Sequence, residues 1–203
     1  MTTASPLRIW TIPNFISLAR LGCVPWFLYL LFGAERSAAA AWLLAVLGAT
    51  DWVDGWIARR FDQGSELGKI LDPTADRALL VAAAIALLVQ DLPGEVDAFL
   101  VVVLVREVLI AVVTVGLALA GARRIDVVWA GKAGTLAVMF SLPMFLLADA
   151  VDGGWSTLLT VGGWGFGVAG IGLGYVAAAQ YLPEARRALA EGRAARRSGA
   201  EVR

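Results

Sequence analysis

The stretch VDAFLVVVLVREVLIAVVTVGLALA, at positions 96–120, decides the class of fold expected for this chain. An α-helix rises about 1.5 Å per residue, so roughly 20 apolar residues are enough to cross the hydrocarbon core of a bilayer. Two other apolar stretches, at positions 133–150 and 158–181, approach or exceed that length. The chain is therefore predicted to be an integral membrane protein made of α-helices.

The amino-acid composition supports this prediction. Of the 203 residues, 59% are hydrophobic, with 17 basic and 17 acidic residues, which is too apolar for an average soluble domain. Histidine is absent, so the usual general base near neutral pH and the commonest zinc ligand are both missing. Cys23 is the only cysteine, so no internal disulfide can form. Any acid–base chemistry must therefore use carboxylates or lysine.

Hydropathy predicts an all-α membrane domain at positions 15–183 with six transmembrane helices. These helices are expected at positions 15–33, 37–60, 74–90, 96–120, 128–150 and 156–182. A short interfacial segment, 1–14, precedes the domain, and we expect it to be retained because it lacks the basic start and apolar core of a signal peptide. Positions 184–203 form a basic tail, expected to be either an exposed helix or a disordered end.

Charge alternates along the predicted loops. Three regions are basic: Arg59, Arg60, Lys69 and Arg77 around the second loop, Arg123, Arg124 and Lys132 around the fourth, and the arginines after Pro183. The loops between them are acidic or balanced. Because basic loops stay on the cytoplasmic side, both termini are expected in the cytoplasm, with the chain in the cell membrane.

Four aspartates lie within 26 positions around the predicted second loop: Asp51, Asp54, Asp72 and Asp76. Spacings of three and four place each pair on one face of its helix, so the two pairs can converge. Asp51 precedes Arg60 by nine residues, so it is expected roughly 13 Å from the cytoplasmic end of its helix, at a depth where an uncompensated charge is costly. Two arginines, Arg59 and Arg60, leave two of the four negative charges unanswered. A divalent cation is the simplest compensation, and oxygen ligands favour Mg²⁺ or Mn²⁺ over zinc.

Two structural interpretations of these residues remain open. Asp72 precedes Pro73, an arrangement typical of a helix start with aspartate as the N-cap. The arginines at positions 59 and 60 can also pair with the carboxylates without any catalytic role.

The segment 51–76, a hairpin made by the end of the second predicted helix and the start of the third, resembles the signature of the CDP-alcohol phosphatidyltransferases. It matches all eight positions of that signature. These are Asp51, Asp54, Gly55, Ala58, Arg59, Gly68, Asp72 and Asp76. The resemblance implies a homodimer with six membrane helices and a site between the second and third helices that opens to the cytoplasmic leaflet. It further implies transfer of a phosphatidyl group from CDP-diacylglycerol to a glycerol-type hydroxyl acceptor, with CMP leaving. We expect no nucleic-acid partner.

The same resemblance assigns roles to these residues. Two Mg²⁺ or Mn²⁺ ions would be held by the aspartates at positions 51, 54, 72 and 76, and Asp76 would also act as the general base. The positions implied to bind CDP are Gly55, Ala58, Arg59 and Gly68. No serine or cysteine is paired with a base, which favours direct displacement over a covalent intermediate.

The acceptor is less well defined by the sequence. Two branches of the family, the phosphatidylglycerophosphate synthases and the eukaryotic-type cardiolipin synthases, are the ones that the chain resembles more. The resemblance lies in Thr11-Ile-Pro-Asn14, Arg20 and the segment 71–77. Arg106 and Lys132 are the candidates for binding an acceptor phosphate. Because the sequence lacks two further cations common in the first branch, phosphatidylglycerol is favoured as acceptor, with glycerol 3-phosphate as the alternative.

Each acceptor-side candidate also has a structural interpretation. Arg106 can form an intramembrane ion pair with the adjacent Glu107. Lys132 can be a basic residue that fixes the topology and has no role in binding the acceptor. An ion transporter is the alternative of another class, since intramembrane acids also mark ion pathways. The position of all four aspartates on one hairpin argues against it, because a pathway needs ionisable groups on several spans.

Overall fold

The computed structural model describes the backbone of residues 12–61, 68–90, 92–119 and 129–201, and the side chains of 15–50, 74–90, 92–116 and 129–180. This described part contains helices and turns and no strand, which confirms the all-α prediction. The elements in chain order are α1 (Ile12–Leu28), the π-helical η1 (Tyr29–Gly33), α2 (Ser37–Phe61), α3 (Gly68–Leu88), α4 (Gly94–Leu119), α5 (Trp129–Asp149) and α6 (Gly154–Glu201).

Two helix boundaries differ from the sequence prediction by more than three residues, when η1 is counted with the first helix. Helix α3 begins at Gly68 and not near position 74, so Asp72 lies inside the helix and the N-cap interpretation is wrong. Helix α6 continues as far as Glu201, far beyond the predicted end at position 182. The basic tail therefore follows the helical alternative, because its alanines and arginines are good helix formers even where the sequence is too polar to span a membrane.

Membrane spans are supported for most but not all of the helices. Among the described residues, four helical segments are long and apolar enough to cross a bilayer: Phe15–Gly33, Gly94–Gly116, Trp129–Asp149 and Gly154–Gln180. A shorter apolar segment, Ser37–Thr50, belongs to α2. A helical membrane protein is thus supported, while a count of six spans stays a prediction.

Short turns connect several of the helices and make sequential neighbours antiparallel. Helix α1 contains Pro25 and widens into the π-helical turn η1, where Ala34 N–H donates to the carbonyl of Tyr29, 2.8 Å away. Glu35, with φ 53°, then reverses the chain into α2. Gly153, with φ 73°, makes the turn from α5 into α6, a conformation that glycine adopts without steric cost.

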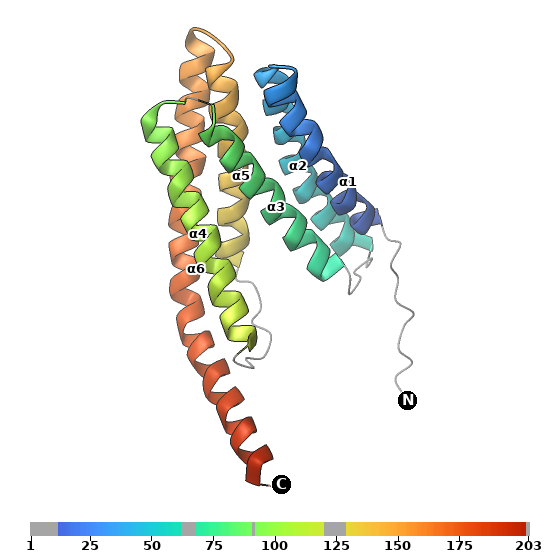
Figure 1. Ribbon diagram of the computed structural model, residues 1–203, viewed down its shortest axis with the longest axis vertical. Helices are drawn as coiled ribbons and strands as arrows, with labels where there is room; N and C mark the ends of the chain where they lie inside the picture. The colour runs from blue at the N-terminus through green and yellow to red at the C-terminus, as the bar shows by residue number, and fades with distance from the viewer. Residues whose placement is uncertain (1–11, 62–67, 91, 120–128, 202–203) are drawn as a thin grey trace.

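The helices alternate in direction, as Figure 1 shows. The start of α1, the end of α2, the start of α3, the end of α4, the start of α5 and the end of α6 all lie toward the lower end in that view. The turns after η1, α3 and α5 lie toward the upper end. This arrangement puts the polar ends of the aspartate-bearing helices at one end of the molecule.

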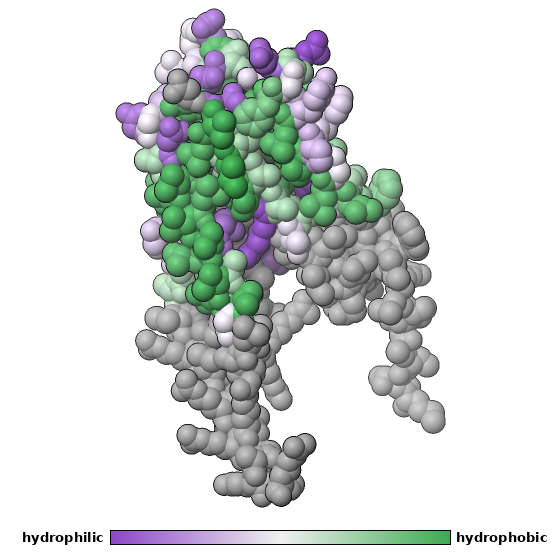
Figure 2. Space-filling model, in the orientation of Figure 1, coloured by the Kyte–Doolittle hydropathy of each residue, from purple (hydrophilic) through white to green (hydrophobic). Residues whose placement is uncertain are grey.

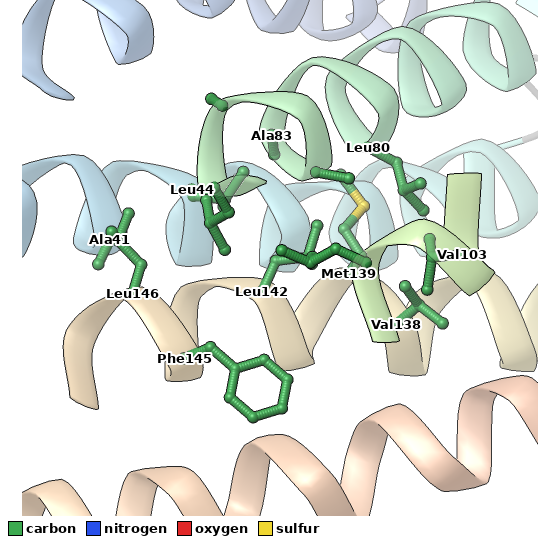
Figure 3. Packing of buried hydrophobic residues seen from close by; sticks show 14 of the residues in the cluster. Ala41, Leu44, Leu80, Ala83, Val103, Val138, Met139, Leu142, Phe145 and Leu146 are labelled. Atoms are coloured by element: carbon green, nitrogen blue, oxygen red, sulfur yellow. The ribbon is translucent and has the colours of Figure 1, made fainter. Parts of the chain in front are cut away.

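Helix α5 forms the centre of the packing. Half of its span is buried, compared with 22% of the α4 span, and it contacts α2, α3 and α6. Figure 3 shows Leu44 of α2, Leu80 of α3, Val103 of α4 and Met139 of α5 converging in one buried cluster. The cluster fixes how α2 and α3 sit on the rest of the protein.

Helix α4 presents an apolar face to the outside. Its exposed residues include Val105, Val108 and Val112, and Figure 2 shows a continuous hydrophobic surface in this region. Such a surface would be unfavourable in water but matches lipid chains. Charged residues of the exposed turns, such as Arg36 and Asp152, lie at the upper end beyond it.

Candidate functional site

The two pairs of aspartates lie on the two helices that the α2–α3 connection joins. Asp51 and Asp54 lie in the second half of α2, and Asp72 and Asp76 lie in the first half of α3. Because both segments are helical, spacings of three and four place each pair on one face of its helix. The side chains of Asp51, Asp54 and Asp72 lie outside the described residues, whereas the surroundings of Asp76 are described.

The predicted CDP-binding positions follow the same helical faces. In α2, Gly55 and Ala58 fall four and seven positions after Asp51, so the three share one stripe. In α3, Gly68 precedes Asp72 by four positions. The earlier start of α3 therefore brings a glycine into line with the aspartates. The side chain of Arg59 lies outside the described residues.

Asp76 forms an ion pair with Arg20 of α1. Nη1 of Arg20 donates to Oδ1 of Asp76. The Arg20 side chain is 1% exposed and that of Asp76 is 19% exposed. A guanidinium is costly to bury unless it is paired, so the carboxylate accounts for the presence of an arginine here. The two residues are 56 positions apart, so their contact depends on the packing of α1 against α3.

The ion pair changes the charge balance derived from sequence. Arg59 and Arg60 against four aspartates left two negative charges, and the addition of Arg20 leaves one. The argument for a metal from charge alone is therefore weaker than the sequence suggested. Among the described side chains no three carboxylates come together as ligands, but that set includes only one of the four aspartates. The donor set itself, four carboxylates without histidine or cysteine, still fits Mg²⁺ or Mn²⁺.

Arg106 of α4 is held by its own helix and by α6. Its Nη1 lies 2.9 Å from Oε1 of Glu107, and the two side chains are 15% and 5% exposed. The ion pair with Glu107, which the sequence offered as the structural interpretation of Arg106, is thus present. A Cβ on Gly174 of α6 would lie 2.6 Å from Nε of Arg106, so the guanidinium is seated against this glycine. The bond to Glu107 uses one of the terminal nitrogens of a group with five N–H donors, so it does not preclude a further ligand.

Lys132 lies in the first turn of α5. It is exposed, near the start of α5, and two positions before the buried Gly134. A Cβ on Gly134 would lie 2.8 Å from the carbonyl oxygen of Gly170 and 3.2 Å from the backbone nitrogen of Gly174. Glycines at the α5–α6 contact thus bring the start of α5 close to the turn of α6 that packs against Arg106, whereas Lys132 itself lies on another face of α5, because positions two apart on a helix do not share a face.

The sequence interpretation missed the role of Arg20. It used this residue only as part of a resemblance, although a lone arginine in an apolar helix was itself a signal that a carboxylate partner should be sought. The identity of that partner could not be derived, because it depends on how α1 packs on α3.

Comparisons with known proteins give one family model and several named relatives. Residues 10–169 match the family model described as CDP-alcohol phosphatidyltransferase. A protein of Streptomyces coelicolor named cardiolipin synthase (CMP-forming) is 38% identical over 187 residues, covering 89% of this chain and 85% of the relative. A Haemophilus influenzae protein named CDP-diacylglycerol–glycerol-3-phosphate 3-phosphatidyltransferase is 29% identical over 136 residues, covering 66% of this chain and 74% of the relative.

Proposed function

This chain belongs to the CDP-alcohol phosphatidyltransferase family, and we propose that it transfers a phosphatidyl group from CDP-diacylglycerol to the free hydroxyl of phosphatidylglycerol, releasing CMP. The product is cardiolipin. The observation that carries this choice of acceptor is the relative named as a CMP-forming cardiolipin synthase. It is more similar, over more of the chain, than the Haemophilus influenzae relative, which is named for transfer to glycerol 3-phosphate.

The ion pair of Arg106 with Glu107 supports the same choice. The phosphodiester of phosphatidylglycerol carries one negative charge, whereas the phosphomonoester of glycerol 3-phosphate carries nearly two at neutral pH. Glu107 offsets the positive charge of Arg106, which leaves Lys132 as the uncompensated cation of the proposed acceptor site. Such a site is better matched to a singly charged phosphate.

The proposed reaction is a direct displacement. The acceptor oxygen forms a bond to the lipid-side phosphorus, the bond from that phosphorus to CMP breaks, and the hydroxyl proton passes to Asp76. A carboxylate is assigned as the base because the chain has no histidine. Gly55, Ala58 and Gly68 leave room for the CDP group, and Arg59 contacts its phosphates.

The family is generally dependent on a divalent metal. Asp51, Asp54, Asp72 and Asp76 would hold two Mg²⁺ or Mn²⁺ ions, which when bound neutralise charge on the diphosphate. We further propose a homodimer with six membrane spans, with both termini and the site on the cytoplasmic side of the cell membrane. The alternation of basic and acidic loops supports this orientation.

Product analysis tests the choice of acceptor. The purified protein is incubated with CDP-diacylglycerol and Mg²⁺, and with either phosphatidylglycerol or glycerol 3-phosphate, and CMP and lipid products are measured. We expect CMP release and cardiolipin with phosphatidylglycerol only. The Asp76→Asn variant is the control and should lose about two to four orders of magnitude in turnover.

The other outcomes are equally clear. CMP release with glycerol 3-phosphate alone would assign the alternative acceptor. No CMP release with either acceptor would contradict the transferase proposal and favour the alternative function, ion transport.

A further inference from the structure

We propose that Arg20 is a positioning residue for the transfer reaction, because its ion pair holds the Asp76 carboxylate in the orientation needed to take the acceptor's proton. The proposal rests on the proposed function of Asp76. It adds α1 to a site that the sequence places on α2 and α3 alone. Arg20 acts through Asp76 and is not proposed to touch either substrate.

The buried face of α1 supports a role beyond packing. Ser17 and Arg20 are buried in the half of the helix nearer to the aspartates, while Phe27 and Leu31 continue the buried face into the hydrophobic cluster. The same face is thus polar beside the site and apolar away from it. If α1 only had to pack against α3, apolar residues at both position 20 and position 76 would serve at lower cost, since replacing both members of a buried ion pair by apolar residues is often neutral or stabilising.

The chemistry of the pair explains what the arginine contributes. A carboxylate at the end of an aspartate side chain can rotate, and a general base must lie within hydrogen-bonding distance of the proton that it takes. The guanidinium of Arg20 is always charged and binds Oδ1 of Asp76 from a second helix. A misplacement of about 1 Å can lower a rate on the order of a hundredfold, so fixing this carboxylate is a sufficient reason for the pair.

A double-mutant cycle tests the proposal. Turnover and the KM for CDP-diacylglycerol are measured, by release of labelled CMP, for the wild type, Arg20→Gln, Asp76→Asn and the double variant. Arg20→Gln alone should lower kcat by about 10- to 100-fold, with KM for CDP-diacylglycerol changed by less than about threefold. In the Asp76→Asn background the same substitution should have no further effect, because Arg20 acts through that carboxylate. Arg20→Lys keeps the charge and should recover part of the lost turnover.

Equal losses from Arg20→Gln in both backgrounds would overturn the proposal. A loss of CDP-lipid binding and of the thermal unfolding transition in both Arg20→Gln and Arg20→Lys would also overturn it, since Arg20 would then be structural. Ser141→Ala is the matched control: Ser141 is buried in α5 and donates to the carbonyl of Val138, away from the site. It should keep wild-type turnover.

The wild type separates this inference from the function on which it rests. The cycle is run with whichever acceptor gives CMP release. Wild-type protein that releases no CMP with phosphatidylglycerol or glycerol 3-phosphate would remove the proposed function and the inference together. An active wild type with independent losses at positions 20 and 76 would remove the inference alone.

Discussion

Two arginines inside apolar helices are paired in different ways. Arg20 reaches a carboxylate on another helix, 56 positions away, so its pair ties α1 to α3 beside the aspartates. Arg106 pairs with the adjacent Glu107, so its pair is local and depends only on α4 and on the space left by Gly174 of α6. The first pair therefore depends on the tertiary structure, whereas the second is available wherever α4 forms.

The metal assignment can be tested at three aspartates. Asp51→Asn, Asp54→Asn and Asp72→Asn each remove one anionic ligand while keeping the size of the side chain. We expect each variant to need more Mg²⁺ for half-maximal CMP release and to have little turnover when the metal is limiting, because a neutral amide is a weaker ligand. Asp97→Asn, on the distant first turn of α4, is the control. Near-wild-type Mg²⁺ dependence in all three variants would contradict the assignment.

The charge of the acceptor site can be tested at Glu107. Glu107→Gln keeps an oxygen beside Arg106 but removes the negative charge. We expect the ratio of kcat/KM for glycerol 3-phosphate to that for phosphatidylglycerol to rise by about tenfold, which corresponds to ~1.4 kcal/mol. Glu95→Gln, exposed in the first turn of the same helix, is the matched control. An unchanged ratio would show that Arg106 and Glu107 do not select the acceptor.

At the scale of the helices, α5 and α6 are joined by a contact between small residues. A Cβ on Gly170 would lie 2.7 Å from Cγ2 of Val138 and 2.8 Å from the carbonyl oxygen of Gly134. Lipid chains are as apolar as leucine, so close packing of this kind is a main source of helix association in a membrane. The contact also places Gly174, and with it Arg106, opposite the start of α5.

Alanine substitutions test this contact. Gly170→Ala should lower the unfolding temperature in detergent by about 3–10 °C, because the added methyl group meets backbone atoms that cannot move aside easily. Gly172→Ala is the matched control, since nothing lies within 4 Å of its Cβ position. It should unfold at the wild-type temperature or slightly above, as alanine is the better helix former. Equal unfolding temperatures would mean that the α5–α6 contact relaxes without cost.

The sequence predicted helices best where their limits coincide with the limits of the apolar stretches. The helices expected at 37–60, 96–120 and 128–150 were confirmed to within two residues as α2, α4 and α5. The start at position 74 was predicted because Lys69, Asp72 and Pro73 before it are polar or helix-breaking. The prediction was wrong, since α3 extends through these residues. Hydropathy locates the apolar core of a membrane and not the end of a helix, which is also why the length of α6 was missed.

The candidate site was predictable only in part. The grouping of its aspartates follows from spacing on single helices, which the sequence gives directly, whereas the CDP-binding glycines were assigned by resemblance to a family signature and stay a prediction. Two other features arise from contacts between helices distant in sequence: the ion pair of Arg20 with Asp76, and the packing of the Arg106 guanidinium against Gly174. No local pattern encodes such contacts, because they depend on how the whole bundle packs.

At the scale of the whole molecule, the position of the α2–α3 connection decides which side of the membrane holds the site. In the arrangement of Figure 1 the end of α2 and the start of α3 lie at the same end as the end of α6. If all six helices span, this connection and the tail are on one side. If only the four long apolar segments span, the arrangement of Figure 1 does not hold in the membrane: α2 and α3 return on the side they entered, and the connection lies opposite the tail.

Cysteine labelling distinguishes these two topologies. In a background with Cys23→Ser, single cysteines are introduced by Gly94→Cys, Ser65→Cys and Ser198→Cys, and sealed vesicles of known orientation are treated with a membrane-impermeant maleimide. Gly94 begins α4, Ser65 belongs to the α2–α3 connection outside the described residues, and Ser198 lies in the last part of α6. Because basic residues flank the connection and fill the tail, we expect positions 65 and 198 to label from the cytoplasmic side and position 94 from the other.

Asp152→Cys, in the exposed turn before α6, is the control and should label with position 94. Labelling of position 65 together with position 94 would leave four spans and a site on the opposite side. Labelling of positions 94 and 198 from one side would exclude both topologies.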